Sequence, residues 1–132
     1  MCIRDRFRFA VEIRNKQWVT AEFLDLLRRH GTCFVLLDLV YMPHPDQLGE
    51  LDLVTSDFHY VRLIGDRKAV DARTDTFDAI VLDQSERLDR WARLIRSHLD
   101  RVAEVYAFAN NHYAGHGPAT IRDLVERIEA DA

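Results

Sequence analysis

The 132-residue sequence contains few cysteines, prolines and glycines: two, three and five, respectively. Cys2 and Cys33 lack any paired spacing, so we interpret both as free thiols in a reducing compartment. The longest strongly apolar run covers residues 33–37, whereas about twenty residues are needed to cross a bilayer. Arg4, Asp5 and Arg6 place charge where a secretory signal needs an apolar segment. We therefore expect a cytoplasmic protein without membrane spans.

The sequence also lacks an excess of charge of either sign. Eighteen Lys and Arg against 22 Asp and Glu give a formal charge of −4, which does not indicate nucleic-acid wrapping but leaves room for a local basic site. With 48% apolar and 10% aromatic residues, the chain is too hydrophobic for a disordered tail. Since a domain takes roughly 150 residues, we expect one domain with a buried core.

Segments of strand formers alternate with amphipathic segments along the chain. We expect strands at 7–13, 33–38, 58–64 and 104–109, and helices at about 20–30, 84–102 and from Pro118 onward. Residues 41–57 are expected to form a long surface loop with one helical turn, and the segment after Gly65 a polar loop. This alternation predicts an α/β fold with about four parallel strands, either half of a (β/α)8 barrel or a small doubly wound sheet.

Polar side chains stand where each predicted strand ends. They are Glu12, Arg14 and Asn15 at the first, Asp38 at the second, Arg62 and Gly65 at the third, and Asn110, Asn111 and His112 at the fourth. Because the carboxyl ends of parallel strands meet at one face, we expect these groups to share one site.

The two carboxylates, Glu12 and Asp38, allow two interpretations. As buried neighbours they could form a general acid/base pair or ligate a metal. Alternatively, they pair with Arg14 and Arg62 in a structural ion network. Arg62 lies within an apolar strand and must be paired there, with a carboxylate or phosphate of a ligand or in an internal salt bridge.

Residues 110–118 are the least generic part of the chain, with two amides, two histidines and two glycines. Gly115 allows close backbone approach, and the helix that Pro118 opens attracts anions at its start, so we expect a cradle for a polar group. His112 and His116 are four residues apart but placed on a loop, so they indicate a metal site only weakly. They act in acid/base or ligand chemistry, or they hold the turn. Arg67 and Lys68 contact phosphate or are simply solvated.

The remaining ring side chains are interpreted as structural. Trp18 is expected to pack under the first helix, together with Phe23, Leu26 and Leu27, and Trp91 lies on the apolar stripe of the long helix. His59 and His98 have no evident partners in the sequence.

Three long motifs strongly resemble the YecE-like family, also called domain of unknown function 72. They are residues 9–15 with Trp18, residues 60–67, and residues 110–118. The resemblance covers nearly everything from Phe7 onward and implies a barrel of the TIM type, of unestablished activity, with these motifs lining the site. Many relatives carry Ser at the position of Gln17 and His at the position of Ile64, which puts proton transfer by that histidine in doubt here.

The length implies part of such a barrel, because a whole one takes about 250 residues. We therefore expect the C-terminal half in residues 7–132, with residues 1–6 as a segment outside the family, introduced by a spurious start. A half barrel has exposed strand edges, so self-association is expected unless the missing half covers them.

These observations lead to a functional hypothesis and its alternatives. The hypothesis is a hydrolase or lyase-type barrel that acts on a phosphate-bearing or other anionic ligand; the alternatives are a non-catalytic binding module for such a ligand and an inactive truncated fragment. The catalytic candidates are Glu12, Asp38, Arg62, Asn111 and His112, and the ligand-binding candidates are Arg14, Gly65, Arg67, Asn110, Gly115 and His116. No cofactor is identified by the sequence.

Overall fold

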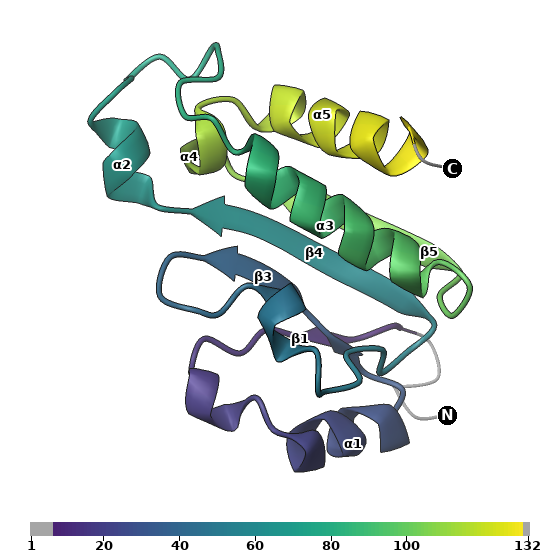
Figure 1. The fold of residues 1–132 in the computed structure, drawn as a ribbon. Helices are drawn as coiled ribbons and strands as arrows, with labels where there is room; N and C mark the ends of the chain where they lie inside the picture. The colour runs from purple at the N-terminus through teal and green to yellow at the C-terminus, as the bar shows by residue number, and fades with distance from the viewer. Residues whose placement is uncertain (1–6, 131–132) are drawn as a thin grey trace.

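The computed structural model describes residues 7–130, in which short parallel strands alternate with helices (Figure 1). The elements are β1 (Ala10–Val11), η2 (Lys16–Trp18), α1 (Ala21–Arg29), β2 (Cys33–Phe34), β3 (Leu36–Leu39), η3 (Pro45–Leu48), β4 (Phe58–Gly65), α2 (Arg67–Asp71), α3 (Ser85–His98), β5 (Glu104–Ala109), α4 (Asn111–Ala114) and α5 (Gly117–Ala130). The expectations for Cys2 and for residues 1–6 lie outside the described residues.

The strands follow one another in space in the order of the chain. β1 pairs with β2, and β3, β4 and β5 form a ladder, all of them parallel. Only Val35 separates β2 from β3, and its N–H donates to the carbonyl of Val11 at 3.0 Å, so the pairing with β1 continues. A doubly wound sheet reverses its strand order, whereas a barrel does not. The expected α/β half of a TIM-type barrel is therefore confirmed.

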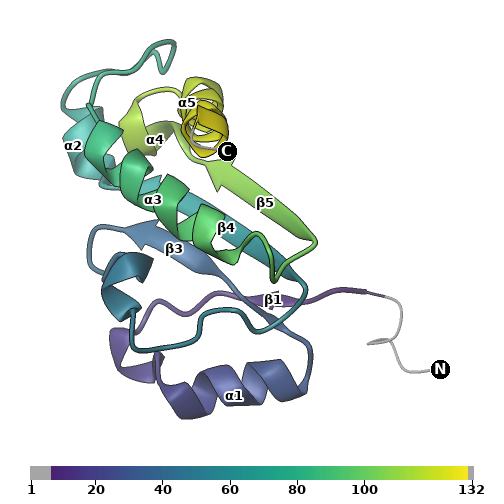
Figure 2. The same cartoon turned by 45° about the vertical axis from the view of Figure 1, so that its right-hand side comes forward.

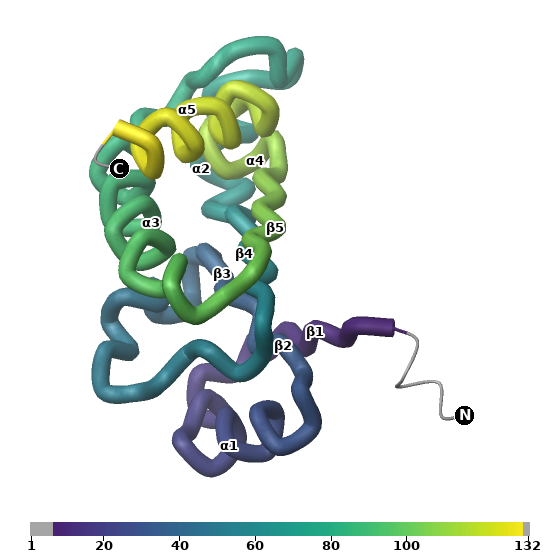
Figure 3. Tube along the Cα trace, turned by 90° about the vertical axis from the view of Figure 1, so that its right-hand side faces the viewer, coloured from purple at the N-terminus to yellow at the C-terminus, as the bar shows by residue number. Residues whose placement is uncertain are grey.

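The helices α1, α3 and α5 cover the convex side of the curved sheet and leave the opposite side without a helix (Figures 2 and 3). The core lies between sheet and helices, where Leu36, Val61, Leu63 and Trp91 are fully buried. Since side chains alternate along a strand, the intervening residues of β4 and β5 face the side without helices.

Local signals place α1 where the sequence predicts it. The Thr20 hydroxyl accepts a hydrogen bond from the N–H of Phe23 at 3.2 Å, as an N-cap does. Gly31, at φ +60°, follows the helix end, because this left-handed conformation costs glycine little. Within the helix, however, Leu24 is buried and Leu26 is 42% exposed, so the predicted packing of Leu26 is wrong.

Three other expectations are corrected. The polar loop after Gly65 is the helix α2, because the carboxylate of Asp66 accepts from the N–H groups of Lys68 and Ala69 and caps it. Part of the predicted loop at 110–117 is the short helix α4. Trp18 is 61% exposed and does not pack under α1. The expected helical turn within 41–57 is confirmed by η3, and no helix among residues 7–130 is long and apolar enough to cross a membrane.

Candidate functional site

The face of the sheet without helices contains an open hollow of about 640 Å³. Its lining residues are Arg8, Ala10, Glu12, Val35, Phe58, Tyr60, Arg62, Tyr106 and Phe108. The lining comes from all four strand positions of the sheet. Val35 lies between β2 and β3, and the other residues are alternate positions along β1 and its flanking residues, β4 and β5, whose side chains point to this face. In a closed barrel this face is the interior, and its upper end, at the carboxyl ends of the strands, is where barrel proteins place their sites.

Glu12, Arg14 and Arg62 form an ion cluster at that carboxyl end. Arg62 Nη1 donates to Glu12 Oε1 at 2.6 Å, and Arg14 Nε donates to Glu12 Oε2 at 2.6 Å. Burial raises the pKa of Glu12, but the hydrogen bonds from Arg14 and Arg62 outweigh it and hold the pKa below its usual value. Glu12 is therefore ionised at neutral pH and is not a proton donor.

Both arginines of this cluster keep part of their surface open. The side chain of Arg14 is 47% exposed and that of Arg62 is 32% exposed, against 19% for Glu12. Two guanidinium groups on one carboxylate leave a local charge of +1. Since each guanidinium has five N–H donors, groups remain for a further acceptor.

Aromatic side chains line the middle of the hollow. Tyr60 and Phe108 stack with ring centroids 5.0 Å apart, and Phe58 meets Tyr106 edge to face at 6.1 Å. At the amino end, Arg8 donates to Glu104 Oε2 at 2.8 Å and to the Tyr106 hydroxyl at 2.6 Å. Glu104 neutralises Arg8 at the amino end of the hollow. The unbalanced positive charge of Arg14 and Arg62 therefore lies at the carboxyl end.

Asp38 does not join this cluster, which corrects the expectation of a shared Glu12–Asp38 site. Asp38 pairs in register with Leu63 on the helix side of the sheet, and it is 2% exposed. Its carboxylate accepts from Arg87 at 3.2 and 2.5 Å. Trp91 Nε1 and the Tyr113 hydroxyl each donate to it at 2.8 Å.

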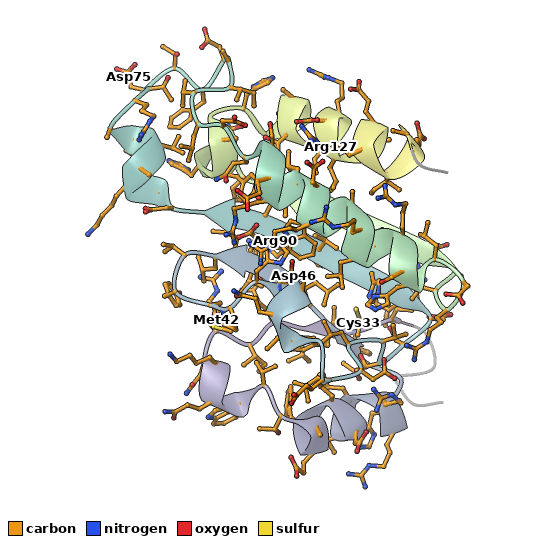
Figure 4. The ribbon with its side chains drawn as sticks, in the orientation of Figure 1. Cys33, Met42, Asp46, Asp75, Arg90 and Arg127 are labelled. Atoms are coloured by element: carbon orange, nitrogen blue, oxygen red, sulfur yellow. The ribbon has the colours of Figure 1, made fainter. Side chains whose placement is uncertain are left out.

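This set of donors fixes Asp38 as an ionised structural group. Burial raises its pKa, but the hydrogen bonds from Arg87, Trp91 and Tyr113 outweigh burial and lower the pKa below its usual value. Asp38 thus joins the end of β3 to α3 and α4. A second hollow of about 350 Å³ lies beside Asp38 and is lined in part by Arg90. Arg90 donates to both carboxylate oxygens of Asp46 at 2.6 Å, and both side chains are labelled in Figure 4.

The predicted cradle at 110–117 is held together mostly by contacts within the chain. Asn111 Oδ1 accepts from the N–H of Gly117 at 2.9 Å, and His116 Nδ1 lies 3.0 Å from the carbonyl oxygen of Phe77. His112 Nε2 lies 3.1 Å from Asp71 Oδ1. Asn111, His112 and His116 thus each have a partner within the chain, and their part in ligand chemistry stays a prediction.

Asn110 is the member of that segment that remains near the hollow. Its N–H donates to the carbonyl of Leu63 at 2.9 Å and extends the β5 ladder by one residue. Alternation from Phe108 then places its exposed side chain on the side of Arg62.

Gly65 and Gly115 serve packing. At Gly65, φ is +76° and an added Cβ would lie 2.9 Å from Tyr113 Cα, so the strand end contacts α4. Arg67 is a further candidate that does not reach the hollow's lining: its side chain is 77% exposed and lies 3.2 Å from Asp71 of the same helix. Within residues 7–130, no three His, Cys, Asp or Glu side chains lie together as metal ligands would.

The structure also shows a histidine pair that sequence reasoning missed. His59 Nε2 lies 2.9 Å from His98 Nδ1, and His59 is 1% exposed. Burial, with the nearby His98 and Arg101, lowers the pKa of His59 to about 4. Burial also lowers the pKa of His98. Both rings are therefore neutral at pH 7.

This pair predicts acid sensitivity. An unfolded histidine titrates near pH 6.5, so between that pH and about 4 the unfolded chain binds a proton that folded His59 does not. The free energy of unfolding is expected to fall as the pH falls through this window, by up to about 1.4 kcal/mol per pH unit from His59. Urea unfolding of the wild type, His59→Gln and the exposed control His30→Gln measures the slope. A slope in His59→Gln equal to the wild type would contradict the assignment.

Comparison with known proteins gives the same fold. Residues 2–132 match a family described as protein of unknown function DUF72. The chain is similar to a DUF72 family protein from Thermotoga maritima MSB8, at 25% identity and a TM-score of 0.68, over 98% of this chain and 49% of that one. It is also similar to one from Enterococcus faecalis V583, at 17% identity and a TM-score of 0.64, over 96% and 50%. No curated protein matches. The chain thus spans about half the length of these solved relatives.

Proposed function

Since this chain belongs to the DUF72 family, whose function is unknown, we propose that it binds a small anionic ligand at the carboxyl end of the hollow, where Arg62 lines the hollow and Arg14 shares Glu12 with Arg62. The observation that carries the proposal is the pair of partly exposed guanidinium groups that share the single carboxylate of Glu12. Guanidinium groups bind phosphates and carboxylates through two parallel hydrogen bonds. The carboxyl end of a barrel is also the usual place for such a ligand.

The lining of the hollow favours a ligand with an apolar or flat part. Tyr60 and Phe108 lie below the arginines, and Phe108 is 49% exposed. An aromatic ring or short apolar chain attached to the anionic group would cover this surface. We therefore take phenyl phosphate as the probe, with phenol and inorganic phosphate as its two halves.

Binding is better supported than catalysis. A hydrolase or lyase needs a group that gives or takes a proton near neutral pH. The lowered pKa of Glu12 excludes it as a proton donor and makes it a weak base. The other carboxylate among the described side chains at the hollow, Glu104, bonds to Arg8 and Tyr106 at the opposite end. The hydrolase or lyase hypothesis stays a prediction, tested by whether phenyl phosphate is recovered unchanged.

Thermal unfolding with each probe at constant ionic strength tests the proposal. Phenyl phosphate is expected to raise the unfolding temperature more than phenol or phosphate does. Arg62→Gln and Arg14→Gln are each expected to weaken binding by about tenfold or more, because a hydrogen bond to a charged group contributes about 1.5–3 kcal/mol. Arg73→Gln is the control, since Arg73 is exposed just after α2, does not line the hollow and bonds to the carbonyl of Ala69.

Two results would overturn this function. One is that none of the anions stabilises the wild type. The other is that Arg62→Gln and Arg14→Gln bind phenyl phosphate as tightly as Arg73→Gln does, which would place the anion elsewhere.

A further inference from the structure

We propose that the second hollow, of about 350 Å³ beside Asp38, binds a small neutral ring that carries several hydroxyl groups, such as a monosaccharide or a cyclitol. The hollow lies at the carboxyl ends of β3 and β4, the end at which barrel proteins place their sites. Its walls come from residues 38–90, inside the chain, and none of its lining residues lines the first hollow. The proposal therefore does not depend on the anion proposed there.

Three segments that are distant in the sequence form the walls. The loop after β3 gives one side, the end of β4 the second, and the beginning of α3 the third. Met42 of the loop and Arg90 of α3 are labelled in Figure 4. Ligand pockets in proteins measure about 300–1,000 Å³, so this hollow accepts a molecule at the small end of that range.

The charges around the hollow do not favour an anion. Arg87 donates through Nε and Nη2 to Asp38, and Arg90 donates through the same two atoms to Asp46. Asp66 is a third carboxylate in the wall, so the carboxylates exceed the guanidinium groups by one charge. Each guanidinium has five N–H donors and uses two on its carboxylate. The arginines thus offer hydrogen bonds to a neutral ligand without an unbalanced positive charge.

Unpaired acceptors and donors lie close together in the wall. Asp66 Oδ1 caps α2, whereas its Oδ2 has no hydrogen-bond partner within residues 7–130. Gln47 Oε1 accepts from the N–H of His44 at 3.0 Å, whereas its Nε2 has no partner in the same part of the chain. Since a hydroxyl group both donates and accepts, neighbouring hydroxyls on one ring satisfy an acceptor and a donor at once.

His44 gives a further observation that points to a ligand. Its side chain lines the hollow and is 1% exposed, and its Nδ1 lies 2.8 Å from Asp46 Oδ1. Its Nε2 is buried without a hydrogen-bond partner among the described residues, which costs free energy in the empty protein. Burial lowers the pKa of His44, so the ring is neutral at pH 7. A ligand hydroxyl that approaches Nε2 supplies the missing bond in either tautomer.

The apolar part of the wall favours a saturated ring over a flat base. Val40 and Met42 line the hollow, and Val40 is 64% exposed. They present aliphatic surface to the C–H groups of a sugar ring. Proteins that bind unpaired bases stack them on aromatic side chains or on guanidinium planes. No Phe, Tyr or Trp is among the lining residues of this hollow, and both of its arginines are held in ion pairs.

NMR titration of the isotope-labelled full chain tests the proposal. The probes are D-glucose, D-galactose, D-mannose and myo-inositol. At least one of them is expected to shift the amide signals of Met42, Gln47 and Asp66 saturably, with a Kd on the order of 1 mM. Tetrahydropyran, the sugar ring without its hydroxyl groups, is expected to give no saturable shift of these signals.

Two variants of nearly unchanged shape locate the site. Gln47→Glu keeps the oxygen that accepts from the backbone and removes the Nε2 donor. Asp66→Asn keeps the oxygen that caps α2 and replaces the free acceptor with a donor. Each is expected to raise the Kd by about threefold or more, since one hydrogen bond to the ring is lost. The controls are Gln17→Glu and Asp83→Asn, which change the same charges at exposed residues outside this lining.

Three results would overturn the hydroxyl-binding site. One is that none of the four probes shifts these signals saturably. Another is that Gln47→Glu and Asp66→Asn bind as tightly as their controls, which places the ring elsewhere. The third is that tetrahydropyran binds as tightly as the sugars, which assigns the hollow to apolar contact alone. The amide signals also show whether each variant is folded. Because no anionic probe is used, failure here leaves the anion-binding proposal standing.

Discussion

Asp38→Asn is expected to lower the free energy of unfolding by about 2–4 kcal/mol, because it removes a buried charged acceptor to which three side chains donate. Asp38 is 2% exposed and neutralises Arg87, and its carboxylate also accepts from Trp91 and Tyr113. An amide of the same shape loses the charge and turns a donor toward groups that are themselves donors. Since small domains are stable by about 5–15 kcal/mol, the loss is a large part of the total.

Urea unfolding followed by circular dichroism measures this effect, with Asp25→Asn as the matched control. The side chain of Asp25 is 67% exposed and its ion pair with Arg28 lies on one helix surface, so a change within about 1 kcal/mol is expected there. Equal small losses in both variants would show that Asp38 does not hold β3 to α3.

Gly115→Ala is expected to lower the free energy of unfolding by about 2–5 kcal/mol, from about 1–2 kcal/mol of left-handed strain and about 1–3 kcal/mol of overpacking. At φ +112°, an added Cβ would lie 2.5 Å from the carbonyl oxygen of Ala79 and 2.8 Å from Val81 Cγ2. The backbone cannot easily give way, because Val81 and Leu82 both donate to the carbonyl of Ala114.

The control for this contact is Gly31→Ala. Gly31 has φ +60°, but nothing lies within 4 Å of the Cβ position, so the substitution introduces the conformational strain alone, about 1–2 kcal/mol. Thermal or urea unfolding of both variants separates the two contributions. If the two variants lose the same stability, the close approach of Ala79 to Gly115 has no energetic consequence.

Much of the fold follows from local signals in the sequence. Thr20 and Gly31 bound α1 as expected, and the stripe with Leu88, Trp91 and Ile95 is buried in α3. The strand ends with Glu12 and Arg62 do converge, because both residues face the hollow at the ends of β1 and β4, on either side of the strand that runs from β2 to β3. These features depend on caps, on periodicity and on the convergence of parallel strands, all of which a sequence displays.

The placement of Asp38 could not be predicted in the same way. Residues 33–39 are buried on both faces of the sheet, so no alternation distinguishes the side of Leu37 from the side of Asp38. The groups that donate hydrogen bonds to Asp38 include Arg87 and Trp91, which are 49 and 53 residues away. Only the docking of α3 on the sheet brings them together.

Contacts across the chain also account for the other differences. The pairing of His59 with His98 joins residues 39 positions apart, and neither residue has a distinctive neighbour in sequence. His112 was expected at the site, but the short helix α2, which only the capping residue Asp66 signals, brings Asp71 to it. Tertiary packing thus gives several candidate site residues partners within the chain and leaves the arginines of the Glu12 cluster partly exposed.

The most direct test of the account is a crystal structure of this chain grown with selenate, an anion whose selenium is located by anomalous scattering. The account predicts an anomalous peak in the hollow, within hydrogen-bond distance of Arg14 and Arg62 and on the side of Asn110. A peak confined to other cationic positions, such as Arg67 and Lys68 of α2, with none beside the Glu12 cluster, would contradict it.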